Sequence, residues 1–174
     1  MPYRLEFASW VPFPVADVFL FFASPENLPR IMPPSTRTRV DELRLVPPEP
    51  MAGTALPAGT MFAGPSSEIV TSFCVLPNLP LRRRWISRIT EFEWNHYFAD
   101  VQVQGPFKSW HHRHELLPEI RDGVQGTVVR DEVQYEIGFG ALEGMVQTLF
   151  VGPQLRATFA YRQEVLPGLL QGKQ

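Results

Sequence analysis

The segment His96–Leu117 reads HYFADVQVQGPFKSWHHRHELL and contains all four histidines of the chain. Apolar and polar residues alternate on both sides of Gly105-Pro106, which is typical of two neighbouring strands joined by a turn. On the second strand, this alternation places Trp110, His112 and His114 on one face of a sheet. Because a tryptophan belongs to that face, we predict that it faces the interior and forms the floor of the functional site.

The direction of Asp100 and Gln102 depends on the turn at Gly105-Pro106. A two-residue turn would place valines beside the histidines and would point Asp100 and Gln102 outward. A bulge or an odd-length loop would reverse this arrangement. Since proline does not fit the second position of the commonest two-residue turn, which needs a positive φ, we predict the bulged register with both side chains on the histidine face.

Length and composition indicate a single globular domain that spans residues 1–174. The chain is 44% hydrophobic and 20% charged, which is enough to bury a core and a cavity within it. Its formal net charge is -2, so we expect no nucleic-acid partner. Cys74 is the only cysteine, which excludes an internal disulfide. With neither a signal peptide nor a membrane span in the sequence, this predicts a cytoplasmic protein.

The first part of the chain predicts a strand, a helix and a second short helix. Tyr3–Val11 alternates as a strand does. Pro14 suits the first turn of a helix that runs to about Ala23, because apolar residues follow it at helical spacing. Pro25–Ile31 predicts a short helix, and residues 36–46 predict a second strand that is irregular near its middle.

Pro47–Gly64 is the only proline- and glycine-rich stretch and is too long for an ordinary connection. It is interpreted either as a mobile lid or as part of an extended third strand. Its apolar side chains suit a lid over an apolar cavity, and they equally suit an ordered loop that is anchored in the core. These side chains are Met51, Leu56, Met61 and Phe62.

The remaining sequence predicts five more strands and a long C-terminal helix. After Gly138 the apolar spacing becomes helical, Gly152-Pro153 predicts a kink or a restart, and Gln154–Leu166 is long enough to lie across a sheet. The expected strands are Ser67–Leu76, Arg82–Trp94, Tyr97–Gln104, Phe107–Leu117 and a last strand around Val129–Ile137. The basic run Arg82-Arg83-Arg84 with Arg88 could contact phosphate, but we interpret it as a solvated strand face because the chain is acidic overall.

Several spaced motifs run through the chain: Trp85…Ile89, Phe98-x-Asp100-x-Gln102-x-x-Gly105-Pro106, Trp110-x-His112-x-His114, Asp131-x-Val133-x-Tyr135 and Phe159-x-x-Arg162. They resemble the START and Bet v 1-like (SRPBCC) superfamily, in particular a bacterial branch of ligand-binding domains related to polyketide cyclase/dehydrases. The order of predicted elements is similar to the helix-grip fold. The chain departs from this pattern in Pro47–Gly64, and it lacks the glycine-rich loop of the plant members.

The resemblance implies an α+β fold in which a curved antiparallel sheet of about seven strands, two short helices and a long C-terminal helix enclose a cavity. It also implies binding of a small apolar or aromatic ligand, lipid- or polyketide-like, between the sheet and that helix. It implies no reaction, because this fold carries binders and enzymes alike.

The polar residues of the predicted floor allow three kinds of chemistry. His112 and His114 would lie about 7 Å apart along the strand, and they could bind a metal if Asp100 or Asp131 converged on them. Since metal sites usually need three or four ligands, we expect neither a metal nor a cofactor. A histidine beside an aspartate could transfer a proton. We favour a buried polar network that shapes the pocket.

Arg162 lies on the apolar stripe of the last helix and has three interpretations. It could be the counter-ion of a buried aspartate, it could bind a ligand carboxylate, or its side chain could extend to solvent.

We therefore expect a carrier or sensor domain for a small hydrophobic ligand. One alternative is a cofactor-free cyclase, dehydratase or isomerase with His112, His114 or Asp131 as candidate catalytic residues. Another is an accessory protein-interaction domain with a vestigial pocket, and a homodimer is left open. The residues expected at the ligand are Phe22, Trp85, Ile89, Asp100, Gln102, Trp110, His112, His114, Asp131, Val133, Tyr135, Met145, Phe159 and Arg162.

Overall fold

A computed structural model describes residues 2–50, 60–74 and 81–172, which form a seven-stranded antiparallel sheet with helices on it. The spatial order of the strands is β1-β7-β6-β5-β4-β3-β2, so the first strand lies beside the last. The strands are β1 (Tyr3–Val11), β2 (Arg39–Arg44), β3 (Glu68–Cys74), β4 (Arg82–Glu93), β5 (Tyr97–Gln104), β6 (Ser109–Arg121) and β7 (Val124–Glu136).

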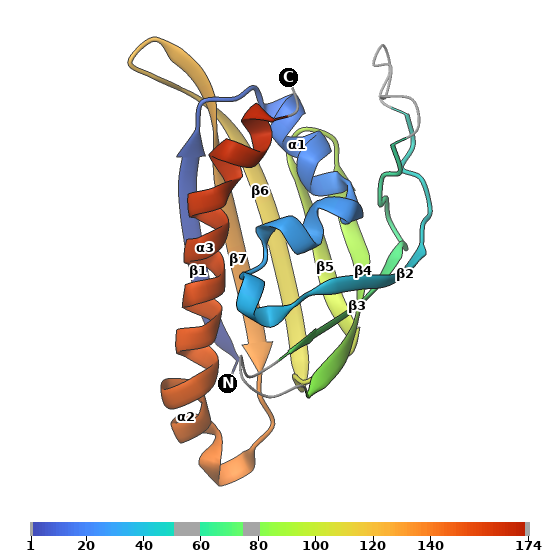
Figure 1. Cartoon of the computed structure of the whole chain (residues 1–174), viewed down its shortest axis with the longest axis vertical. Coiled ribbons are helices and arrows are strands. Elements are labelled where there is room, and N and C mark those ends of the chain that lie inside the picture. The colour runs from blue at the N-terminus through green and yellow to red at the C-terminus, as the bar shows by residue number, and fades with distance from the viewer. Residues whose placement is uncertain (1, 51–59, 75–80, 173–174) are drawn as a thin grey trace.

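Two groups of helices lie on one face of this sheet (Figure 1). The first group joins β1 to β2 and consists of α1 (Val15–Ala23), η1 (Pro25–Ile31) and η2 (Pro34–Thr36). The second group ends the chain and consists of η3 (Gly140–Leu142), α2 (Glu143–Val146), η4 (Gln147–Val151) and α3 (Gly152–Gln171). Figure 1 shows α3 lying along the sheet with α1 beside its C-terminal end. The predicted α+β helix-grip fold is confirmed.

The second strand is shorter than the predicted 36–46 because a 3-10 turn takes up its start. Residues Pro34–Thr36 form η2, and Arg37 ends it in the left-handed conformation at φ 46°. The irregularity expected near the middle of the strand is a register shift between Val40 and Glu42. The 3-10 turn that begins at Pro34, and the left-handed residue that ends it, therefore delay the start of the strand to Arg39.

The C-terminal helix is longer than predicted and is widened where a kink was expected. It runs as α3 from Gly152 to Gln171, and the preceding turn, η4, is π-helical. Pro153 has no N–H for the carbonyl of Leu149 and its ring crowds that carbonyl, so the turn before it opens instead of breaking the helix. The helix therefore continues through Gly152-Pro153.

The proline-rich stretch 47–64 is described only at its two ends. Met51 and Leu56 lie outside the described residues, as does most of the predicted lid. Phe62 is buried in the core, whereas Met61 is about half exposed. The N–H of Ala63 donates to the carbonyl of Ala23, 3.0 Å away, which ties this end of the stretch to α1. For Phe62, the anchored-loop interpretation is therefore the correct one.

The helices are held to the sheet by two clusters of buried apolar side chains. The larger cluster joins α1, the sheet and the C-terminal half of α3, and includes Phe19, Leu116 and Leu166. The smaller cluster includes Trp110 and Phe159 and packs the N-terminal half of α3. Among the described residues, no helix is long and apolar enough to span a membrane.

We predict that Leu166→Ala lowers the free energy of unfolding by about 2–5 kcal/mol, because it removes a fully buried side chain and leaves a cavity. Leu166 is 1% exposed, whereas Glu164 lies exposed on the same helix. Urea denaturation of both variants measures the effect, and Glu164→Ala should change stability by less than about 0.5 kcal/mol. Equal effects of the two substitutions would contradict the docking of α3 on the larger cluster.

Candidate functional site

The register between β5 and β6 places Asp100 on the histidine face. Asp100 pairs directly with His112, and Phe98 pairs with His114, so these four side chains lie on the same side of the sheet. The bulged register predicted for Asp100 is thereby confirmed.

Gln102 does not join the site, which corrects the prediction for this residue. Its side-chain amide donates to the carbonyl of Phe107 at 2.7 Å and its oxygen accepts from the Phe107 N–H at 3.2 Å. Because the side chain folds over the turn, a Cβ at Gly105 would clash with it. The Phe98-x-Asp100-x-Gln102 motif therefore divides into two pocket residues and one that braces the turn.

A pocket of about 1430 Å³ lies between the sheet, η1 and α3. Most of the residues expected at the ligand line it: Phe22, Trp85, Ile89, Asp100, Trp110, His112, His114, Phe159 and Arg162. Others in its wall were not predicted. Phe98 follows from the same alternation that places Asp100, whereas Asn27 and Leu28 on η1 carry no signal in the sequence that points to a site.

Four other predicted residues lie outside the pocket wall. Asp131 is 2% exposed and lies behind the histidines, while Val133 and Tyr135 are fully buried in the smaller apolar cluster. Met145 is 53% exposed on α2, and Figure 1 shows this short helix past the ends of the strands. Alternation along β7 correctly separates inner from outer residues, but it does not distinguish a pocket wall from packed core.

One carboxylate oxygen of β7 contacts polar side chains of β6 and α3. Oδ1 of Asp131 on β7 lies 2.9 Å from Nε2 of His112 on β6 and accepts a hydrogen bond from Arg162 on α3 at 3.1 Å. Nδ1 of His114 is 2.8 Å from the same oxygen, but its direction does not satisfy a hydrogen bond, so that contact is mainly electrostatic. Arg162 is 5% exposed and is therefore the counter-ion of Asp131.

Burial and charge set the protonation of this cluster. Burial alone would raise the pKa of Asp131, but Arg162 and the two histidines outweigh it and hold that pKa well below its usual value. Burial, with His114 nearby, lowers the pKa of His112 to about 4, and burial also lowers the pKa of His114. At neutral pH the cluster thus contains an ionised Asp131, a charged Arg162 and two neutral imidazoles.

Aromatic side chains hold both imidazoles in place. The ring of Phe98 stacks on His114 with centroids 4.4 Å apart, and Phe159 meets His112 edge-on at 5.3 Å. The two imidazoles lie 3.9 Å apart. Since packing and the Asp131 contacts fix the rings together, their remaining nitrogen atoms have defined directions.

Besides Nδ1 of His114, two buried donors in the pocket wall lack hydrogen-bond partners. Nε1 of Trp110 and Nε of Arg162 make no hydrogen bond within the described part of the chain. Neither nitrogen is exposed to the pocket in this structure, and unpaired buried donors of this kind cost stability.

The other basic residues and histidines lie apart from this cluster. His111 points to the opposite face of β6, where its Nε2 is 3.5 Å from Glu91, and His96 lies beside Glu93. Arg88 pairs with Glu68 at 2.6 Å. Arg82, Arg83 and Arg84 contribute to the pocket rim in addition to facing solvent.

We predict that Asp131→Asn lowers the free energy of unfolding by about 3–5 kcal/mol, because it leaves the charge of Arg162 buried and unpaired. The double variant Asp131→Asn, Arg162→Met should recover part of this loss in urea denaturation. Glu132→Gln on the same strand is the control, since it alters only surface contacts with Arg4 and Gln134 and should cost less than about 1 kcal/mol. A double variant no more stable than the single one would refute the charge argument.

Solved structures with a similar fold cover almost the whole chain. Protein TTHA0849 from Thermus thermophilus matches with a TM-score of 0.68 and 16% identity over 98% of this chain and 99% of that one. A START superfamily protein from Mycobacterium smegmatis matches with a TM-score of 0.62 and 12% identity over 98% and 99%. Norcoclaurine synthase from Thalictrum flavum, in complex with dopamine and hydroxybenzaldehyde, matches with a TM-score of 0.57 and 11% identity over 95% and 87%.

At these identities the likeness shows the fold alone. A search of curated proteins finds no match. The profile of one protein family, described as polyketide cyclase / dehydrase and lipid transport, matches residues 11–160. This range contains α1, the strands β2–β7, the histidine face and most of the pocket wall. The chain belongs to the polyketide cyclase / dehydrase and lipid transport family, within the START and Bet v 1-like superfamily.

Proposed function

We propose that the protein binds a small apolar, partly aromatic molecule, lipid- or polyketide-like, in the pocket under α3. The observation that carries this proposal is a connected aromatic wall. Trp85 meets Trp110 edge-on at 5.0 Å and Phe107 at 5.6 Å, and Phe107 and Trp110 lie 5.0 Å apart. Such rings offer large apolar area at fixed positions, which favours flat or apolar ligands.

The free donors define the polar part of the ligand. The indole N–H of Trp110 needs an acceptor, and Arg162 has a second unpaired N–H beside the histidines. A ligand with a carbonyl, hydroxyl or carboxylate oxygen at one end would satisfy these groups once their side chains turn toward the pocket, and its apolar body would lie against the aromatic wall. The proposed class is therefore an apolar molecule that carries oxygen at one end.

Exposed apolar residues at the open end of the pocket indicate that a ligand would enter from the side of α2 and η4. Phe139, Leu149 and Phe150 belong to the pocket lining, and each is more than half exposed. Large apolar side chains that remain exposed beside a pocket are typical of a ligand-binding mouth.

Two competing functions are less well supported. A general base works best with a pKa near the working pH, and the pKa of His112, about 4, makes its ring a weak base. A vestigial pocket in an interaction domain would be small or filled, whereas this one exceeds the roughly 300–1,000 Å³ of ordinary ligand sites.

The aromatic compounds in the norcoclaurine synthase structure and the lipid transport in the family description agree with the proposed ligand class. Cys74, buried and unpaired, agrees with the cytoplasmic location that we also propose.

We predict that an added ring in the pocket blocks ligand binding. Thr158 and Ala160 lie on the same helix, but only Thr158 belongs to the pocket wall. Thr158→Trp should weaken binding of the fluorescent apolar probe anilinonaphthalene sulfonate by about tenfold or more, which corresponds to about 1.4 kcal/mol.

Ala160→Trp is the matched control and should bind the probe as the native protein does. The native protein should also retain apolar compounds that native mass spectrometry detects. A native protein that binds no probe, or two variants that bind equally, would overturn the proposed function.

A further inference from the structure

Asp100 presents a carboxylate to the pocket that no hydrogen bond satisfies within the described residues. Its side chain is 15% exposed, and its Oδ1 lies 3.7 Å from Nδ1 of His112, which is too far for a hydrogen bond. This carboxylate therefore lacks a positive partner.

Asp131 decides which ring nitrogens are free. Because Nε2 of His112 donates to Asp131, the neutral ring carries its lone pair on Nδ1, and this lone pair faces Asp100. With Nδ1 of His114 beside Asp131, the free nitrogen of His114 is Nε2. Nδ1 of His112 and Oδ1 of Asp100 thus face each other at 3.7 Å, too far apart for a hydrogen bond.

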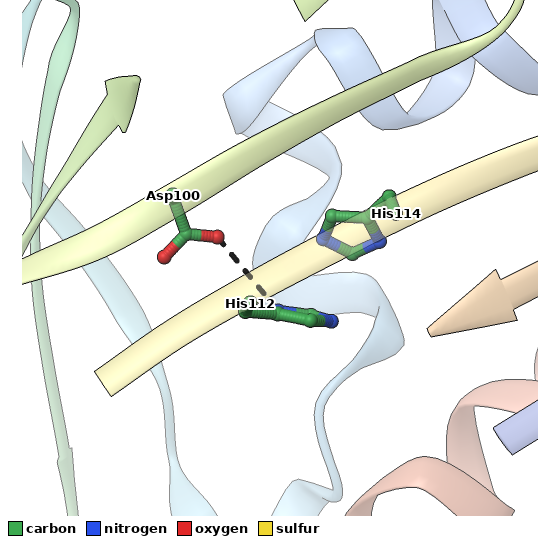
Figure 2. Close-up of side chains that lie close together, drawn as sticks. All are labelled: Asp100, His112 and His114. Carbon is green, nitrogen blue, oxygen red and sulfur yellow. Dashed lines mark ion pairs between the residues drawn. The ribbon is translucent and has the colours of Figure 1, made fainter. Parts of the chain in front are cut away.

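Asp100, His112 and His114 each offer one ligand atom, and these three atoms lie within 4.8 Å of one another. Figure 2 shows the three side chains converging from β5 and β6. Zinc ligands about 2.0–2.1 Å from the metal are separated by about 3.4 Å in tetrahedral geometry, so small side-chain rotations close the site. We propose that Asp100, His112 and His114 bind a divalent transition-metal ion in the pocket.

The type of ligand and the local charge select the kind of ion. Two imidazoles and one carboxylate suit zinc or ferrous iron, whereas magnesium and calcium prefer oxygen ligands alone. Among the described residues no lysine or arginine pairs with Asp100, so a cation between Asp100 and the histidines would be its positive partner.

Asp131 would orient the histidine ligands without contacting the metal ion itself. Metal-bound histidines commonly donate their other N–H to a carboxylate, which fixes the ring and its protonation, and Asp131 accepts such a bond from His112. All three proposed ligands belong to the pocket wall, so open coordination positions face the pocket. The ion could bind water or a ligand oxygen there, and its binding does not depend on the proposed apolar ligand.

The test is titration of the metal-free full-length protein with Co²⁺, followed by visible absorption, and then with Zn²⁺ in competition. We expect one Co²⁺ per chain with the absorption of a four- or five-coordinate site, displacement by Zn²⁺, and no displacement by Mg²⁺. Asp100→Asn keeps the shape of the side chain and should weaken binding by more than the roughly 10–100-fold that loss of an outer support costs.

His112→Gln and His111→Gln form a matched pair, because these neighbours lie on opposite faces of β6. The first should abolish the Co²⁺ signal and the second should leave it unchanged, with circular dichroism confirming that both variants fold. If His112→Gln fails to fold, Asp100→Asn decides the test. A native protein that binds no Co²⁺, binding that survives Asp100→Asn, or binding lost in His111→Gln would each overturn the proposal. Probe binding measured in the presence of a chelator tests the apolar pocket separately.

Discussion

The ion pair between Asp131 and Arg162 is the interaction on which the pocket depends. Asp131 lies on β7 and Arg162 on α3, and both are almost fully buried. A buried charge is tolerated only when it is paired and hydrogen-bonded, so α3 must dock with Arg162 facing this one position of the sheet. Apolar packing alone would allow the helix to slide, because it is not directional. The pair therefore fixes the distance between the two walls and keeps the space between them open.

The same carboxylate also orients the pocket floor. Asp131 occupies one nitrogen of His112 and lies against one nitrogen of His114, so the other nitrogens are left for whatever the pocket contains. Phe98 and Phe159 pack against the two rings and limit how far they turn. A polar group of this kind costs stability in an apolar pocket, and the contacts of Asp131 with His112 and Arg162 make it tolerable. The residue that defines the chemistry of the floor is thus one that does not touch the pocket.

Period-two alternation and proline placement allowed most of the fold to be predicted, because both act within a few residues. The strand Tyr3–Val11, the register at Asp100 and the inner face of β7 all follow from such local patterns. The site was harder to predict because it depends on contacts between distant elements. Gln102 shares the alternation of Asp100, yet its amide is long enough to reach the backbone of Phe107. Val133 and Tyr135 share the face of Asp131, yet the residues packed over them close that part of the sheet.

A single proline, Pro153, shapes the helix at the open end of the pocket. Pro153 widens the preceding turn into a π-helix, and the hydroxyl of Tyr135 on β7 is within 3.1 Å of the side-chain amide of Gln147, where that turn begins. The turn is therefore held to the sheet at its first residue. Its hydrogen bonds are π-helical instead of α-helical. Leu149 and Phe150 are carried into the rim of the pocket at 61% and 60% exposure instead of packing into the core. Exposed apolar area of this size is unfavourable in water, and a ligand that covers it on entry gains that free energy. The fold thus leaves large apolar side chains exposed at the rim of the pocket.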